Sequence, residues 1–158
     1  MNNNKIPDVM IVRIPTFRAV TSGLLPFNEL FEVFGSWQEA NNHLFKPIIF
    51  DGCDFLTGVD DKMEWFWRVH DDVTETDVTP YTLTTLTGGL YAVATCIDGD
   101  GESHQQVREK MFTWLESSDF VLDSTRREAG HMIYVEDDIQ EGLGYNQLNL
   151  YLPISRLK

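Results

Sequence analysis

One pattern occurs twice in this sequence: a strand-like segment, a turn, and a helix whose apolar face contains a tryptophan. The clearer copy runs from Gly88-Gly89-Leu90-Tyr91-Ala92-Val93 to a helix carrying Met111-Phe112-Thr113-Trp114. A fainter copy lies in the first half, where residues 12–20 precede a helix carrying Phe34-Gly35-Ser36-Trp37. Two similar half-folds packed side by side create a seam, and small ligands usually bind in such concave places. The doubling therefore predicts two related modules with a candidate binding site between them.

The spacing of apolar residues predicts the elements of each half. Apolar side chains recur at three- and four-residue steps from Phe27 to Ala40, which is typical of a helix with one buried face. A second such helix, with Met111 and Leu115 on one face, follows an acidic turn. Strand-like segments surround both helices, so we predict an α+β fold with a mainly antiparallel sheet and two long helices. We expect one domain over residues 1–158, built of pseudo-twofold duplicated strand-helix-strand-strand modules at about 8–75 and 80–156.

The charge of the chain limits its partners. It has 25 acidic and 12 basic residues and a formal net charge of −13, which would repel phosphate backbones, so we expect no direct nucleic-acid binding. Such a surface either attracts cationic ligands and basic proteins or serves solubility alone, and both interpretations stay open. No apolar segment approaches the ~18 residues of a membrane span, and the first residues are no signal peptide. We therefore expect a cytoplasmic protein that does not contact membranes.

Metal-binding and catalytic patterns are missing from the sequence. The four histidines form no HxH or HExxH pattern. Cys53 and Cys96 lack metal-ligand spacing and have no evident base beside them, so we expect reduced thiols. The acidic turn that begins at Asp98 resembles a calcium loop only in part, because Ser103 stands where that loop requires glycine. We predict no metal, no cofactor and no recognisable set of catalytic residues.

Three segments together resemble a known family. They are Gly88-Gly89-Leu90-Tyr91-Ala92-Val93, the helix with Trp114, and the closing strand Leu150-Tyr151-Leu152-Pro153-Ile154. In order and spacing they resemble the GyrI-like effector-binding domain, which occurs at the C-terminus of many AraC-type and some multidrug-responsive transcription regulators and also as a stand-alone protein. The resemblance is firm over residues 81–154 and looser before them. It implies a stand-alone sensor module that binds bulky aromatic or cationic molecules in a cleft between two strand-helix-strand-strand modules.

One position departs from the family pattern. Family members often place a glutamate four residues before the proline of the closing strand, where it can meet a ligand's positive charge. Here that position is Asn149, and an amide can hydrogen-bond a cation but cannot neutralise it. Aligning the last strands of the two halves sets Glu64 opposite Asn149, so we predict that Glu64 supplies the cleft carboxylate. The alternative is that Glu64 pairs with Arg68 or faces solvent, as most glutamates do.

Aromatic side chains complete the predicted site. Stacking and cation–π attraction contribute ~0.5–2 kcal/mol for each ring. Tyr91 and Tyr151 lie in the motif strands and are the strongest aromatic candidates, whereas Trp37 and Trp114 have the helix spacing of core residues. The candidate ligand-binding residues are Glu64, Phe66, Tyr91, Trp114, Tyr134, Asn149 and Tyr151.

Three functions are compatible with the resemblance. We favour the binding of amphipathic, aromatic, cationic compounds. Some stand-alone relatives inhibit DNA gyrase, so a second candidate is a protein-interaction role in which the acidic surface competes with DNA for gyrase or another basic partner, or engages a regulator. Some family members hydrolyse strained electrophilic compounds with a cleft glutamate and a tyrosine, and this third function would require Glu64 or another acid to replace the family carboxylate.

Overall fold

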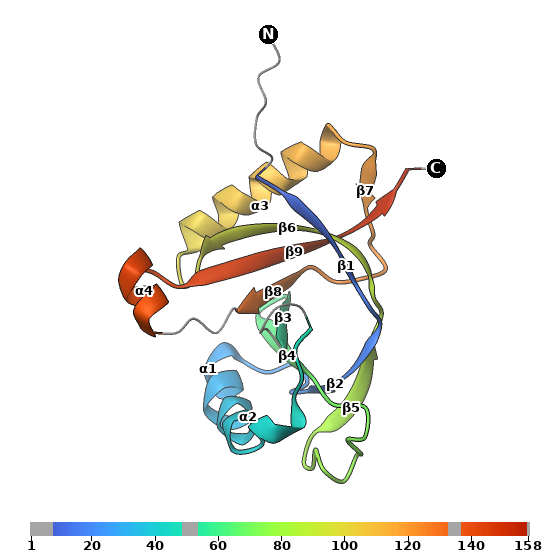
Figure 1. Ribbon diagram of the computed structural model, residues 1–158, viewed down its shortest axis with the longest axis vertical. Helices are drawn as coiled ribbons and strands as arrows, with labels where there is room; N and C mark the ends of the chain where they lie inside the picture. The colour runs from blue at the N-terminus through green and yellow to red at the C-terminus, as the bar shows by residue number, and fades with distance from the viewer. Residues whose placement is uncertain (1–7, 49–53, 133–136, 158) are drawn as a thin grey trace.

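The structure is a computed structural model that describes residues 8–48, 54–132 and 137–157 (Figure 1). It contains strands in both halves of the chain and two principal helical regions. The strands are β1 (Met10–Ile14), β2 (Phe17–Thr21), β3 (Asp54–Val59), β4 (Lys62–Arg68), β5 (Thr82–Leu86), β6 (Gly89–Ile97), β7 (Phe120–Leu122), β8 (Ala129–Met132) and β9 (Gln147–Arg156). The helical segments are α1 (Phe27–Glu29), a π-helical stretch (Leu30–Gly35), α2 (Ser36–Ala40), a 3-10 turn (Asn42–Leu44), α3 (Gly101–Glu116) and α4 (Asp137–Leu143).

The two predicted long helices are present. In the first half α1, the π-helical stretch and α2 follow one another without a break, so residues 27–40 form one helix with a wide turn in its middle. Leu30 and Phe34 are fully buried on its inner face. In the second half α3 buries Met111 and Leu115 against the sheet. The predicted α+β fold with two long helices is confirmed.

The sheet shows the predicted duplication. Its strand order is β1-β6-β9-β8-β3-β4-β2-β5, with β7 also paired to β9, and the pairs between named strands are antiparallel. The six inner strands read β6-β9-β8 from one side and β2-β4-β3 from the other. Each triplet comes from one half of the chain, in the same order of strand, helix, strand and strand. The two modules therefore meet where β3 pairs with β8, at Leu56 and Gly130.

Strand register relates the last strands of the two modules. At the junction Leu56 lies opposite Gly130. One strand outward, Leu56 pairs with Trp65 on β4, and Gly130 pairs with Leu150 on β9. Trp65 and Leu150 are therefore equivalent, and so are their preceding neighbours on β4 and β9. Glu64 and Asn149 therefore occupy equivalent positions in the two modules, as the alignment of the two halves predicts.

A bent pair of strands connects the modules. β1 pairs with β6 and β2 pairs with β5 in one continuous register, interrupted only between Ile14 and Phe17. At this bend a Cβ on Gly88 would lie 2.3 Å from the carbonyl oxygen of Ile14 and 2.4 Å from the nitrogen of Thr16, so only glycine fits. Figure 1 shows the bent pair along one side of the molecule, reaching from the α3 module to the module with α1 and α2. The bend curves the sheet around its concave face.

Three hydrophobic clusters follow from this arrangement. One packs under α3, around Ala92, Met111 and Leu152. Another packs under residues 27–40, around Phe34 and Trp65. The third lies on the concave face and takes side chains from both modules. Its buried members are Ile14, Phe17, Ala19, Phe55, Phe66, Tyr91, Val93, Ala129 and Tyr151.

The helices within the described ranges give no candidate for a membrane span. None of them combines the length and the apolar character that crossing a bilayer requires.

Candidate functional site

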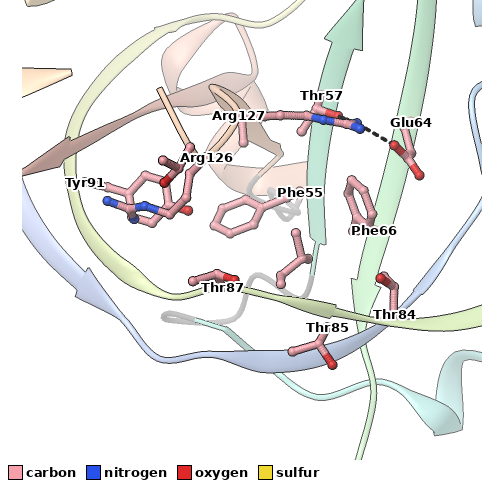
Figure 2. A pocket seen from close by; sticks show the side chains of 13 residues that line it. Phe55, Thr57, Glu64, Phe66, Thr84, Thr85, Thr87, Tyr91, Arg126 and Arg127 are labelled. Atoms are coloured by element: carbon pink, nitrogen blue, oxygen red, sulfur yellow. Dashed lines mark hydrogen bonds and ion pairs between the residues drawn. The ribbon is translucent and has the colours of Figure 1, made fainter. Parts of the chain in front are cut away.

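A cavity of about 280 Å³ lies on the concave face, beside the cluster shared by the two modules (Figure 2). Its walls come from β3 and β4 of the first module, from β5 and β6, and from β8 and the segment between β7 and β8. The lining residues are Phe55, Thr57, Glu64, Phe66, Thr84, Thr85, Leu86, Thr87, Tyr91, Thr125, Arg126, Arg127 and Ala129. Both halves of the chain therefore contribute to one site, as the doubling predicts.

Aromatic rings form the apolar part of the cavity. Phe55 and Phe66 pair in register on β3 and β4, and alternation along these strands points both side chains to the concave face. Tyr91 comes from the other module, with its ring centroid 6.2 Å from that of Phe55. Five threonines from different elements also line the cavity and carry hydroxyl groups. This combination suits a ligand with a flat apolar body and polar substituents.

Glu64 lies at the cavity wall on β4, and its side chain is only 13% exposed. Its Oε1 accepts a hydrogen bond of 2.7 Å from the Thr21 hydroxyl. Its Oε2 accepts one of 2.5 Å from Nη1 of Arg127, and Figure 2 marks this contact. The ion-pair partner of Glu64 is thus Arg127, whereas Arg68 donates to the carbonyl of Pro47 at 2.6 Å. Glu64 therefore neither pairs with Arg68 nor lies fully in solvent, the two alternatives that the sequence left open.

Arg126 fixes the segment that carries Arg127. Its side chain is 7% exposed, and its Nε donates to a carboxylate oxygen of Asp123 at 2.8 Å. Its Nη2 donates to the carbonyl oxygens of Leu90 and Ile154. The guanidinium also lies 4.6 Å from the centroid of the Tyr91 ring, a cation–π distance. Hydrogen bonds from Thr125 and then from Arg126 lower the pKa of Asp123 from its ordinary 3.8, so this carboxylate stays charged and holds Arg126.

The sequence motifs do not point to either arginine, because no local pattern links them to Glu64, which lies 63 positions away from Arg127. One signal is nevertheless present in the sequence. Among the 12 basic residues of this acidic chain, Arg126 and Arg127 form the single adjacent pair. This pair lies between two strands of the second module, and it is the sequence feature that marks Arg126 and Arg127 as candidate residues for the site between the modules.

Asn149 and Tyr151 lie close to the cavity but do not line it. Both side chains are buried, and Asn149 Oδ1 accepts a hydrogen bond of 2.7 Å from the Thr95 hydroxyl. The Tyr151 ring packs edge-on against Phe55, with centroids 5.0 Å apart. Burial raises the pKa of Tyr151 to about 12, although a hydrogen bond with the Asn149 side chain lowers it. Tyr151 therefore packs behind Phe55, which lines the cavity, as a neutral phenol.

Two further candidates lie elsewhere. Trp114 is half-buried on α3 and stacks on Phe120, with ring centroids 6.0 Å apart; it packs with the cluster under α3, away from the cavity. Tyr134 lies outside the described residues. Of the predicted set, the structure thus brings Glu64, Phe66 and Tyr91 to the cavity, with Asn149 and Tyr151 behind it.

Metal ligands do not gather in the described ranges. Across residues 8–48, 54–132 and 137–157, no three side chains of His, Cys, Asp or Glu come together as a metal site requires.

Comparison with known proteins identifies the fold. No protein-family model and no curated protein matches the sequence. Among solved structures, the EcmrR C-terminal domain has a TM-score of 0.67 at 14% identity, covering 96% of this chain and 99% of that one. SAV2435 bound to tetraphenylphosphonium has a TM-score of 0.58 at 13% identity, covering 94% of each chain. A hydrolase from Listeria innocua has a TM-score of 0.59 at 14% identity, covering 94% of this chain and 92% of that one. The chain therefore has the fold of the GyrI-like effector-binding domains that its motifs resemble.

Proposed function

We propose that this protein binds amphipathic aromatic small molecules in the cavity between its modules, with Glu64 facing the cationic group of the ligand. The observation that carries the proposal is the position of one largely buried carboxylate beside three aromatic rings, drawn from both modules, around a cavity of about 280 Å³. SAV2435, which shares the fold, was solved with the lipophilic cation tetraphenylphosphonium. That likeness supports aromatic cations as the ligand class, and it does not decide whether the cationic group of the ligand donates hydrogen bonds.

The walls provide two separate contributions to binding. Phe55, Phe66 and Tyr91 line the apolar part of the cavity and remove apolar ligand surface from water. Glu64 adds a charge–charge attraction to a ligand cation that replaces Arg127, its ion-pair partner in the free protein. A neutral aromatic compound would use only the first contribution, whereas an aromatic cation would use both.

Calorimetric titration with two compounds that share their rings tests this proposal. Biphenyl-4-carboxamidine is a cation and biphenyl-4-carboxamide is its neutral counterpart. We expect Glu64→Gln to weaken binding of the cation about tenfold, the scale of one charged hydrogen bond, and to change the affinity of the neutral compound much less, because that compound donates hydrogen bonds but carries no charge. Calorimetry is preferable to tryptophan quenching, because no tryptophan of the described ranges lines the cavity.

Glu116→Gln provides a matched control, since Glu116 is exposed at the end of α3 and does not line the cavity. This variant changes the net charge by the same amount and should bind both compounds as the wild type does. Equal affinity of wild type and Glu64→Gln for the amidine would contradict the role given to Glu64. Failure of both compounds to bind would contradict the proposed function itself.

The two other functions stay predictions. Hydrolysis with a cleft glutamate would require Glu64 to exchange its ion pair with Arg127 for a contact with substrate or water. No contact among the described residues favours a gyrase or regulator partner over a small molecule.

A further inference from the structure

We propose that Arg127 is an internal competitor for the cationic group of the ligand, and that it makes the cavity selective for cations that donate hydrogen bonds. This inference rests on the proposed function, because it assumes that ligands bind beside Glu64. It adds a residue that sets which ligands the site accepts.

The guanidinium of Arg127 occupies the position that a ligand cation would need. It contacts Oε2 of Glu64 at 2.5 Å, and Oε1 is already bonded to the Thr21 hydroxyl. Both oxygens of the carboxylate are therefore hydrogen-bonded, and its charge is already balanced. A cation that takes the place of Arg127 at Oε2 must displace it, so the measured affinity for the cation includes the cost of that displacement.

Arg127 is placed so that its side chain can leave while its backbone stays. The side chain is 52% exposed, and its second contact, to the Thr57 hydroxyl, is long at 3.5 Å. Figure 2 shows it extending from its segment past Thr57 to Glu64. The neighbouring Arg126 holds the segment through Asp123 and two backbone carbonyls. Rotation of the Arg127 side chain into water would therefore free Oε2 of Glu64 without moving the backbone that lines the cavity.

The departure of Arg127 affects the two oxygens of Glu64 differently. Oε1 keeps its hydrogen bond from Thr21, whereas Oε2 loses its donor. An amidinium or primary ammonium group can donate a new hydrogen bond to Oε2. A quaternary ammonium or phosphonium group carries the same charge but has no N–H, so it leaves a largely buried acceptor unsatisfied, which is costly. Competition with Arg127 should therefore favour hydrogen-bonding cations.

The test uses three probes with the same rings: biphenyl-4-carboxamidine, biphenyl-4-yl-trimethylammonium and the neutral biphenyl-4-carboxamide. Calorimetric affinities are compared for the wild type, Arg127→Met, Arg127→Ala and Glu64→Gln/Arg127→Met. Methionine keeps much of the length of arginine but has no charge and no donor. The control is Lys46→Met, which also removes one positive charge and one ion pair, with Asp71, away from the cavity.

We expect the wild type to bind the amidine more tightly than the trimethylammonium compound. Arg127→Met and Arg127→Ala should tighten the binding of both cations, on the order of tenfold, because a competing charged hydrogen bond is gone. The gain should disappear in Glu64→Gln/Arg127→Met, and Lys46→Met should show none. The affinity of the neutral carboxamide, which donates hydrogen bonds but carries no charge, should change much less than that of the cations in all these variants.

The possible results separate this inference from the proposed function. If the wild type binds the probes and both Arg127 variants bind the cations no more tightly, the competitor role is wrong while the binding function stands. If the wild type shows no preference between the two cations, the selectivity is wrong. If no probe binds to any variant, the proposed function is wrong, and the role of Arg127 falls with it.

Discussion

Arg126 is the residue on which the shape of the site most depends. Its charged side chain is strongly buried, and it joins β6, β9 and the segment before β8 through Leu90, Ile154 and Asp123. Its guanidinium also covers the Tyr91 ring. A buried arginine is tolerated only when such partners replace water. Arg126 therefore positions both Tyr91 and the neighbouring Arg127 without being exposed itself.

We expect Arg126→Met to lower the free energy of unfolding by about 3 kcal/mol, because several carbonyl and carboxylate groups lose their donor at once. Urea denaturation followed by circular dichroism measures this change. Arg108→Met is the control, since Arg108 forms a half-exposed ion pair with Glu128, and should cost ~0–1 kcal/mol. Equal losses in the two variants would show that Arg126 has no special structural role.

Tyr151 gives the protein a predictable response to alkaline pH. Its pKa is raised to about 12 by burial, from an ordinary value of 10.0, so the folded state holds the phenolic proton more tightly than the unfolded state does. Stability should therefore fall as the pH rises from about 10 to about 12. We expect Tyr151→Phe to flatten this decline in denaturation experiments across that range. Tyr145, which is exposed, is the control, and Tyr145→Phe should leave the decline unchanged.

Among the elements, the bent strand pair of β1–β2 with β6–β5 depends for its shape on a single glycine, Gly88. The bend at Gly88-Gly89 has a physical reason, which is the close approach of Gly88 to the backbone of residues 14–16. Asp100 caps α3 by accepting hydrogen bonds from the N–H groups of Glu102 and Ser103, although Ser103 and Gln106 have the spacing of a capping box. Ser103 instead accepts a hydrogen bond from the N–H of Ile97.

Gly88→Ala should destabilise the protein by about 2–4 kcal/mol, because the added methyl group would overlap backbone atoms that cannot move independently. Gly101→Ala is the matched control. Gly101 begins α3 and has open space around its Cβ position, so alanine there should leave stability unchanged or raise it by up to ~1 kcal/mol. Thermal or urea unfolding of both variants decides the comparison, and similar stabilities would rule out the close-approach explanation.

At the scale of the whole molecule, the hydrophobic cluster on the concave face joins the two modules into one folding unit. Phe55 of the first module packs against Tyr91 and Tyr151 of the second, with ring centroids 6.2 Å and 5.0 Å apart. The sheet also continues through the junction of β3 with β8. Loss of a side chain at this place should therefore weaken both modules together.

We expect Phe55→Ala to reduce stability by about 3–5 kcal/mol, the range for removing a buried phenylalanine ring, and unfolding to remain a single transition. Tryptophan fluorescence mostly reports the first half, which holds Trp37, Trp65 and Trp67, while circular dichroism reports the whole chain. The two signals should change at the same urea concentration. Separate transitions would contradict the view of one unit, and the exposed Val33, replaced by alanine, should have an effect of only about 0.5 kcal/mol.

The sequence by itself determined the features that depend on local spacing. The apolar periodicity of residues 27–40 and of α3, the glycines at the bend, and the repeated order of elements all leave a pattern along the chain, because helix faces and strand alternation have fixed periods. For the same reason the alignment of the last two strands found the equivalence of Glu64 and Asn149, and it brought Glu64, Phe66 and Tyr91 into the candidate site.

Only the tertiary structure decided what surrounds Glu64. Arg127 reaches it across 63 positions of the chain, and such a contact follows from how β8 and β9 pack beside β3 and β4, not from any local spacing. Tertiary packing also placed Trp114 of α3 against Phe120, away from the cavity, and Tyr151 behind the cavity. A strand or helix period tells which face a side chain takes but not what covers that face. The sequence pattern indicates the two modules, whereas the pairing of Glu64 with Arg127 depends on how the modules pack together.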